Sequence, residues 1–586
     1  MAKRIKVITK DPAPLVSRPW TRFYDPGVPA TIRYPTDATV QALLDDAAES
    51  FPNATATIFF DAKRSYKSLS DDTWRFANGL RTMGVKKGDR VAIMLPNTPQ
   101  FIMAFFGALR AGAIVVPCNP LYTVPELRHQ LQDSGAETIV VLSRLYPVVK
   151  AAREGTAIKR VLVTNIKEEM PPILRTLFTL AKEKKDGHRQ PFAGDPGAVA
   201  FRDVVRNGSP APFDVGTRAN DVALFQYTGG TTGVSKGAML SHRALVANTL
   251  QCRSWFSDEV DGTGVGMAVM PFFHVYGLTV VMLQAVQAAA AMVLEPQFEL
   301  EHVLKDVAKH KPRTFPGAPR IYNAIINSPL AKKYDLRSIG ACISGSAPLM
   351  VETHKKFTEL TGAKLVEGYG LTEAAPVTHC NPLYGEGKQK IGTIGVPYPD
   401  VECRIVDTET GERDLPAGEP GELILRGPQL MDGYYNQPAE TAKTIRDGWL
   451  YTGDIATVDQ DGYYAIVDRK KEMIIVSGYN VYPREVEEAM ATHPAVIDSA
   501  AIGRPHPIKG EEVKVFVVLR PGQTATPEEL IAHARTQLAP FKVPHEVEFR
   551  DSLPKTLIGK TLRRQLAEED RKKRGESEKP KVATPA

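Results

Sequence analysis

A run of glycines and threonines followed by a lysine is the stretch of this sequence best suited to bind an anion. It reads YTGGTTGVSKGAML, from Tyr227 to Leu240. Glycines let backbone N–H groups converge on an anion without a Cβ in the way, threonine hydroxyls add donors, and Lys236 adds a positive charge. The run VALFQ before it, residues 222–226, predicts a strand that leads straight into the loop. A polyphosphate is therefore the expected ligand.

Two other interpretations of this loop are a P-loop and a plain surface turn. The P-loop pattern G-x-x-x-x-G-K-[ST] fails, because counting from Gly230 puts Ser235 at the second glycine and Gly237 at the Ser/Thr position. Clusters of Gly, Ser and Thr are common in turns, so on this stretch alone a flexible surface loop stays open.

Four further stretches place polar groups among glycines or beside charges. They are EGYGLTE (367–373), YTGD (451–454), DRKKE leading into MIIVSG (468–478), and PKTLIGKTLRR (554–564). Each has a plain alternative: a turn, a hairpin corner, or a solvated basic helix start. In this order and spacing they make the chain resemble the adenylate-forming superfamily of acyl-CoA synthetases, luciferases and peptide-synthetase adenylation domains. The resemblance covers about residues 34–566 and is closest to bacterial long-chain fatty-acid–CoA ligases, through YTGGTTG, PFFHVYGL and EGYGLTE.

The resemblance implies that the loop grips the β- and γ-phosphates of ATP while a carboxylate attacks the α-phosphate. The residues expected to bind the pyrophosphate portion are Thr228, Gly229, Gly230, Thr231, Thr232, Gly233 and Lys236. Glu373, a hard oxygen ligand, is expected to hold Mg²⁺, with Thr228 as a second candidate ligand. Thr372 is expected to contact the α-phosphate.

The same resemblance assigns the adenosine contacts and a lysine. Adenine is expected against Tyr369 and the turn of Gly345, Ser346 and Ala347. Asp454 is expected to accept both ribose hydroxyls, since a carboxylate offers two acceptor oxygens, and Arg469 is the second ribose contact. Lys560 is expected to bridge the substrate carboxylate and the α-phosphate, because catalysis of such a transfer is mainly positioning plus cationic stabilisation.

The second half-reaction that the resemblance implies is attack of coenzyme A on the acyl-adenylate. In the family a smaller, mobile domain rotates between the two steps, and the resemblance places the hinge at Asp468. The rotation replaces the face with Lys560 by the face with Gly478, whose missing side chain leaves room for pantetheine.

The acyl substrate is predicted from the residues that match the acyl pocket of the family. They are His274, Tyr276, Gly277, Leu278, Gly368 and Gly370. Acetyl-CoA synthetases carry a tryptophan at the position of Gly370, so the position is expected to be open here. No aspartate stands near residues 272–274 to bind an amino group, which argues against an amino acid.

Two of these residues carry alternatives. His274 is expected to line the acyl channel, with a satisfied buried histidine as the alternative. Leu278 stands where some long-chain relatives have a gating tryptophan, which leaves chain length open. The expected activity is an ATP-dependent long-chain fatty acid:CoA ligase. The alternatives are a medium-chain or aryl acid CoA ligase and a non-catalytic acyl-nucleotide sensor.

Composition limits the class and the location. A net charge of +6, from 73 basic and 67 acidic residues, is too slight to argue for nucleic acid but suits anionic small molecules or weak contact with a membrane surface. The five cysteines are scattered, which favours a reducing cytosol over disulfides. The N-terminus shows no secretory signal, and residues 275–294 are expected to form a buried helix rather than a membrane span. A cytoplasmic protein is predicted, with at most a peripheral association with the inner membrane face; a homodimer stays open.

The elements that must position these residues alternate along the chain. Strand 91–95, a helix from Pro99 to Gly112, strand 113–116, a helix capped by Thr123 and Glu126, and strand 138–142 indicate parallel sheets covered by helices. We expect an α/β fold with a large N-terminal domain, residues 1–467.

The character of the sequence changes after Asp468. A helix over 483–491, strands near residue 500 and over 513–519, and a helix capped by Thr526 and Glu529 predict a smaller α+β domain, residues 468–566. The charged tail, residues 567–586, is expected to be disordered.

Overall fold

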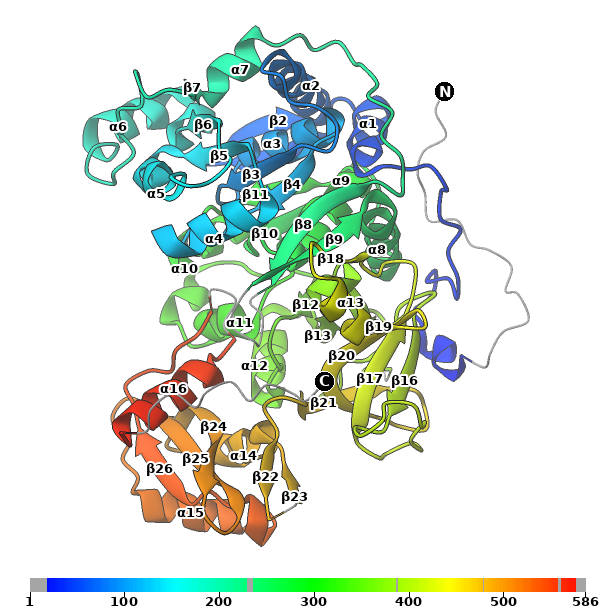
Figure 1. Ribbon diagram of the computed structural model, residues 1–586, viewed down its shortest axis with the longest axis vertical. Coiled ribbons are helices and arrows are strands. Elements are labelled where there is room, and N and C mark those ends of the chain that lie inside the picture. The colour runs from blue at the N-terminus through cyan, green and yellow to red at the C-terminus, as the bar shows by residue number, and fades with distance from the viewer. Residues whose placement is uncertain (1–17, 229–234, 386–387, 478, 557–559, 576–586) are drawn as a thin grey trace. The chain divides into compact units, whose positions relative to one another are not determined.

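The computed structural model describes residues 18–228, 235–385, 388–477, 479–556 and 560–575, and these form two compact units (Figure 1). The larger unit comprises the described residues of Met1–Cys403, Leu425–Tyr451 and Asp461–Tyr463, and the smaller one those of Arg404–Ile424, Thr452–Gln460 and Tyr464–Ala586. This division differs from a single boundary at residue 468, because two earlier segments group with the smaller unit.

The central sheet of the larger unit has eight strands in the order β18-β9-β8-β4-β3-β5-β6-β7. These strands are β3 (Arg90–Met94), β4 (Ile114–Pro117), β5 (Thr138–Leu142), β6 (Arg160–Thr164), β7 (Ala198–Ala200), β8 (Val222–Thr228), β9 (Lys236–Ser241) and β18 (Gly433–Tyr434). The six from β8 to β7 run parallel, whereas β9 is antiparallel to β8 and β18 to β9. The expected parallel sheet is confirmed.

Helices cover this sheet and its neighbours in the larger unit (Figure 1). They are α1 (Val40–Ser50), α2 (Tyr66–Thr82), α3 (Pro99–Arg110), α4 (Val124–Ser134), α5 (Tyr146–Ala152), α6 (Pro172–Ala181), α7 (Phe201–Asn207), α8 (His242–Trp255), α9 (Gln284–Gln287), α10 (Leu300–His310), α11 (Pro319–Ile326), α12 (Val351–Thr361) and α13 (Pro438–Thr444).

Local signals explain where the first of these helices begin and end. Thr98 accepts a hydrogen bond from the N–H of Phe101 at 3.3 Å and caps α3, which is buried along its whole length. The predicted capping box of Thr123 and Glu126 starts α4, and Gly135 ends it in the left-handed conformation, with φ 61°.

Two four-stranded sheets complete the larger unit's core. The first has the order β10-β11-β1-β2 and the second β12-β13-β14-β15. Their strands are β1 (Thr55–Phe59), β2 (Ala62–Ser65), β10 (Val265–Ala268), β11 (Ala291–Leu294), β12 (Ala341–Ser344), β13 (Lys364–Gly370), β14 (Val377–Cys380) and β15 (Val396–Pro397). Because β12 and β13 are parallel, their carboxyl ends meet at one edge.

The apolar stretch 275–294 forms three elements. A π-helical segment, η4 (Gly277–Leu283), continues into α9, and the stretch ends in strand β11. All three are buried. The expected buried helix is correct for the first part only, because the last residues pair with β1 and β10. Among the described residues, no helix combines the length and apolarity needed to cross a membrane.

The smaller unit is built on a sheet in the order β23-β22-β25-β24, with β26 paired to β25. Its elements are β21 (Tyr464–Arg469), β22 (Ile474–Val476), β23 (Tyr479–Val481), α14 (Pro483–Ala491), β24 (Val496–His506), β25 (Gly510–Leu519), α15 (Pro527–Arg535), β26 (Glu546–Phe549) and α16 (Arg563–Lys573). Parts of β16 (Glu402–Val406), β17 (Gly421–Arg426) and β20 (Trp449–Val458) belong to it as well, whereas β19 (Ile445–Arg446) lies in the larger unit. The predicted α+β character is confirmed.

Helix α16 corrects the expectation of a disordered tail after residue 566. It continues to Lys573, because Leu566 is fully buried and Asp570 pairs with Lys514 at 2.6 Å inside the unit. The sequence of this helix has little apolar periodicity, so its partners on other strands, rather than its own pattern, hold it.

Candidate active site

The two ends of the glycine–threonine loop lie side by side on β8 and β9. Thr228 and Lys236 are Cα partners of the antiparallel pair. Tyr227 anchors the first strand by donating to Asp133 at 2.5 Å. The predicted ligands Gly229, Gly230, Thr231, Thr232 and Gly233 lie outside the described residues.

Lys236 meets two side chains that sequence reasoning did not single out. Its ammonium pairs with Glu440 of α13 and lies 5.3 Å from the ring centre of Tyr434 on β18. The hydrogen bonds from Lys236 and Lys443 lower the pKa of Glu440 to about 2, so this carboxylate is charged at neutral pH. Glu440 is therefore a charged partner of Lys236 at the loop's end.

Tyr434 connects the lysine to the predicted metal ligand. Its hydroxyl donates to Oε1 of Glu373 at 2.6 Å. Strand β18 places it there by pairing Tyr434 with Ala238 of β9. Tyr434 thus links Lys236, which follows the glycine–threonine loop, to Glu373 of the GYGLTE motif. It belongs to the stretch DGYYNQPAE, whose sequence carries only a weak turn signal.

Buried polar side chains hold the backbone of the turn that follows the GYGLTE segment. The segment ends β13 and turns through the 3₁₀ helix η6 (Thr372–Ala374), which leaves Thr372 and Glu373 half-buried. Asn248 of α8 makes two hydrogen bonds to the backbone of Val377, at 2.8 and 3.0 Å, and Thr279 donates to the carbonyl of Ala375 at 2.8 Å. These contacts hold the backbone that presents the two predicted catalytic residues.

The residues expected to contact adenine follow the adjacent ends of β12 and β13. Ser346 is in the left-handed region with φ 72°, which a non-glycine residue rarely adopts, and the Gly345–Ala347 turn is part-exposed after residue 345. Tyr276 supports this turn: it is buried, its hydroxyl donates to Ile343 at 2.6 Å, and its ring would lie 3.4 Å from a Cβ at Gly345. Tyr369 is half-buried on β13, edge-on to His379.

The histidine of the predicted acyl channel is a neutral residue. Burial lowers the pKa of His274 to about 4, and its Nδ1 accepts from the N–H of Tyr276 at 3.2 Å. The proton is therefore on Nε2. Leu278, at the position of the absent tryptophan, is fully buried in η4.

Local packing alone explains why glycine stands at three positions assigned to the acyl pocket. A Cβ would lie 2.2 Å from the Pro271 carbonyl oxygen at Gly277, 2.8 Å from Ile343 at Gly368, and 2.2 Å from the Pro376 carbonyl oxygen at Gly370. At Gly370 a side chain would meet the backbone of the following turn, and the openness of the acyl pocket beside this residue stays a prediction.

The predicted ribose contacts pair with each other in the smaller unit. Asp454 and Arg469 are Cα partners across β20 and β21, with Nε–Oδ1 at 3.1 Å. Asp454 is buried and Arg469 is 37% exposed along its side chain. The YTGD motif, whose plain alternative was a hairpin corner, lies within β20, where Gly453 alone takes a positive φ of 72° among its four residues.

The predicted hinge residue ties two elements of the smaller unit together. Asp468 is buried and accepts from the N–H groups of Arg469 and of Arg484, both at 2.7 Å, the second at the start of α14. Burial raises its pKa, against the nearby charge of Arg563. Gly478, the predicted pantetheine-facing residue, lies outside the described residues.

Lys560 is half-buried beside the ribose contacts. Burial and the charge of Arg469 lower its pKa to about 8, although Glu472 and Asp454 act in the opposite direction. Its backbone N–H donates to the hydroxyl of Thr556 at 3.0 Å. No described residue forms an ion pair with its ammonium within 4 Å.

An arginine network holds the segment that carries Lys560. Arg563, at the start of α16, pairs with Glu472 and with Glu487, the latter at 2.7 Å. Burial opposes its charge, but the two carboxylates outweigh this and raise the pKa of the guanidinium. The sequence presented Arg563 as one more cation in a basic run, because its partners lie far away along the chain.

Two places among the described residues offer carboxylates to a metal ion. Glu373 uses one oxygen for Tyr434, which leaves the other oxygen of a part-exposed carboxylate for a further partner. Mg²⁺ commonly takes one or two carboxylates plus phosphate oxygens. Among the described residues, one group of three carboxylates lies close enough to share an ion: Glu546, Glu548 and Asp570. The ammonium of Lys514 already pairs with all three, at 2.6–2.8 Å, so Glu373 fits better.

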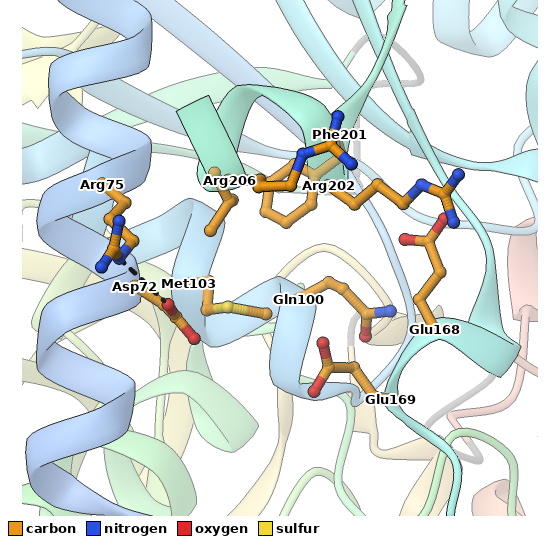
Figure 2. A pocket seen from close by; sticks show the side chains of 10 residues that line it. Asp72, Arg75, Gln100, Met103, Glu168, Glu169, Phe201, Arg202 and Arg206 are labelled. Atoms are coloured by element: carbon orange, nitrogen blue, oxygen red, sulfur yellow. Dashed lines mark ion pairs between the residues drawn. The ribbon is translucent and has the colours of Figure 1, made fainter. Parts of the chain in front are cut away.

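A separate cavity of about 420 Å³ lies in the larger unit among residues of α2, α3, α7 and η3 (Ile166–Glu169) (Figure 2). No predicted site residue lines it. Two of its carboxylates, Asp72 and Glu169, pair with Arg64, the second at 2.6 Å. This cavity is not the candidate site.

The fold and the site together define an adenylate-forming enzyme: an α/β unit with a Gly/Thr loop joined to a GYGLTE turn, and an α+β unit with a lysine beside an Asp–Arg pair. The chain belongs to the AMP-binding enzyme family, whose model matches residues 44–435, and the AMP-binding enzyme C-terminal domain matches residues 485–560.

Relatives agree with this assignment over nearly the whole length. A long-chain-fatty-acid–CoA ligase of Bacillus subtilis is 44% identical over 94% of this chain and 98% of its own, and one of Yersinia pestis is 38% identical over the same shares. The crystal structure of ATP-bound MatB from Rhodopseudomonas palustris superposes with a TM-score of 0.79 at 29% identity, over 91% of this chain and 99% of that one.

Proposed function

We propose that this protein is an ATP-dependent long-chain fatty acid:CoA ligase. A fatty acid and ATP give an acyl-adenylate and pyrophosphate, and coenzyme A then gives acyl-CoA and AMP. The observation that carries the proposal is a chain of contacts that starts at the end of the Gly/Thr loop. Lys236 pairs with Glu440 and lies over the ring of Tyr434, and Tyr434 donates to Glu373. The similarity to long-chain-fatty-acid–CoA ligases supports the choice of acid.

Activation by AMP solves a chemical problem of the carboxylate. Its own leaving group would be oxide, whereas the mixed anhydride has a stable phosphate as leaving group. Negative charge gathers on the α-phosphate in the transition state, so fixed cations accelerate the step. Lys236 and the loop hold the β- and γ-phosphates, Thr372 contacts the α-phosphate, and Lys560 bridges it to the acid.

Two groups of residues are assigned to the nucleoside part of ATP, one for adenine and one for ribose. Tyr369 and the turn at Ser346 face adenine, and Tyr276 supports that turn from beneath. Asp454 accepts the ribose hydroxyls, with Arg469 turning from its partner toward the ribose. Mg²⁺, held by Glu373 and Thr228, supplies positive charge to the phosphates when bound.

The thioester step needs a different face of the smaller unit. A lysine and a thiol cannot occupy the same place at the acyl carbon, so the unit rotates about Asp468 and exchanges Lys560 for Gly478. Asp468 lies on β21 and accepts from the backbone N–H of Arg484, so the proposed hinge residue joins this strand to helix α14.

The apolar chain of the acid bears on both the preferred substrate and the location of the enzyme. Each CH₂ group buried in an apolar channel contributes roughly 0.8 kcal/mol, which favours long acids. Neutral His274 lines the channel without placing a charge there. A long-chain acid partitions into bilayers, so a cytoplasmic enzyme that visits the inner membrane face is the proposed location. A homodimer remains compatible with this function.

Two assays test the function. Pyrophosphate exchange into ATP should depend on added fatty acid, which separates a ligase from an acyl-nucleotide sensor. Thioester formation across acids from acetate to oleate should favour chains longer than about 10 carbons, because transfer free energy grows with each CH₂. Equal rates on acetate or benzoate would overturn the long-chain assignment.

The pKa of Lys560 predicts a pH dependence. Its lowered value of about 8 means that the ammonium is present below this pH and is lost above it. We expect kcat/KM for adenylation to fall about tenfold per pH unit above pH ~8, since only the charged form stabilises the transition state. A Lys560→Arg variant, which stays protonated, should show no such fall in the pyrophosphate exchange assay. The same fall in both proteins would assign it to another group.

A further inference from the structure

Helix α6 exposes a stripe of apolar side chains to solvent. Ile173, Leu177 and Leu180 are 79%, 57% and 81% exposed. They are spaced by four and three residues, so they lie on one face of the helix. Single exposed apolar residues are ordinary, but three large ones on one ten-residue helix form a patch that indicates an interaction surface.

The orientation of α6 is fixed by contacts on its other side. The ring of Phe178 packs edge-on against His188, with ring centres 5.5 Å apart. Arg175 donates to the carbonyls of Lys167, Glu168 and Met170 at 2.8–3.1 Å. The helix therefore cannot roll to bury its stripe without losing these contacts. Figure 1 shows α6 at the edge of the larger unit, near β6 and β7.

Positive charge surrounds the end of the stripe. Lys182, Lys184 and Lys185 follow the helix directly and are exposed, and none of them has an ion-pair partner within the described part of the chain. Of the two acidic residues in this segment, Glu183 is buried and already paired with Lys167 at 2.7 Å, and Asp186 is exposed next to Lys185. Residues 171–190 carry five basic and two acidic side chains, so this segment holds half of the chain's net charge of +6.

We propose that α6 docks the protein on an anionic bilayer surface, with Ile173, Leu177 and Leu180 in the acyl-chain boundary and the three lysines on the headgroups. An amphipathic helix with flanking lysines binds such a surface by apolar burial plus attraction to anionic lipid. The inference rests on the proposed function, because a long-chain acid is dissolved in that bilayer. A second copy of the chain fits less well, since a two-fold contact across this face would oppose the lysine clusters of both copies.

Cosedimentation of the full chain with vesicles tests the docking. One set of vesicles contains phosphatidylcholine alone, and the other an equal mixture of phosphatidylcholine and phosphatidylglycerol. Binding should be at least about tenfold tighter to the mixed vesicles, and added salt should reduce that difference.

Two variants separate the apolar and the charged contributions. The triple change Ile173→Ser, Leu177→Ser and Leu180→Ser should weaken partitioning about a hundredfold, because three apolar side chains leave the lipid. The change of the three lysines to Gln should remove the preference for anionic vesicles. The control is Leu121→Ser with Ile508→Ser, which removes exposed apolar groups elsewhere, at 65% and 90% exposure, and should change nothing.

The outcomes distinguish this proposal from its alternatives. Undiminished vesicle binding by the triple serine variant overturns it, as does a wild-type chain that ignores both vesicle types. A triple variant that instead changes the sedimentation of the free protein from dimer to monomer means that a second copy covers the face. Vesicle binding through α6 without any fatty-acid-dependent pyrophosphate exchange would leave the docking intact and refute the ligase function.

Discussion

Replacing Lys560 by alanine is expected to reduce adenylation at least a hundredfold while leaving the thioester step near its wild-type rate. One cation used only in the transition state is typically worth about 3 kcal/mol. Lys560 is half-buried, its pKa is near 8, and the Arg563 network holds its segment, so the side chain is held where its charge counts. Adenylation is measured by pyrophosphate exchange, and thiolysis by supplying acyl-adenylate with coenzyme A.

The control is another cation of the same basic run. Arg564 is 58% exposed and pairs with Glu568 one helical turn away, an arrangement typical of a solvated surface pair. Arg564→Ala should therefore leave both half-reactions unchanged. If Lys560→Ala slows both steps equally, the rotation of the smaller unit is the wrong account. If Lys560→Ala slows neither step, Lys560 is a solvated surface cation, as Arg564 is.

Elements with strong local signals were predictable from the sequence. Thr98 with Pro99, the box of Thr123 and Glu126, and the glycine at 135 each act within a few residues, and the structure places helix ends at all of them. Apolar runs such as 138–142 are buried on both faces, and that pattern is typical of a central parallel strand.

What the sequence did not show depends on partners far along the chain. Tyr434 and Glu440 join the site only because β18 pairs with β9, some two hundred residues earlier. Helix α16 persists past residue 566 because Asp570 meets Lys514.

The local packing that requires a glycine at a given position is also not visible in a motif. A Cβ at Gly370 would lie 2.2 Å from the Pro376 carbonyl oxygen, because the turn after β13 brings this backbone close.

The carboxylate of Glu373 should be needed for its charge and not only for its shape. Glu373→Gln keeps an acceptor for the Tyr434 hydroxyl, so the turn should stay in place. It removes the negative charge that Mg²⁺ prefers in a ligand. We expect adenylation to fall about a hundredfold and the Mg²⁺ concentration for half-maximal rate to rise, because the loss falls on charge stabilisation at the phosphates.

The matched control is Glu440→Gln, which also replaces a carboxylate of the candidate site by an amide but is expected to leave the Mg²⁺ dependence unchanged. Glu440 pairs with Lys236 and so competes with phosphate for that ammonium. Glu440→Gln should leave the Mg²⁺ dependence unchanged and should not weaken ATP binding. Both variants are compared in pyrophosphate exchange titrated with Mg²⁺. A wild-type Mg²⁺ dependence in Glu373→Gln would show that Glu373 is not a ligand, and a shift of equal size in Glu440→Gln would mean that general charge near the loop, rather than a ligand bond, sets the requirement.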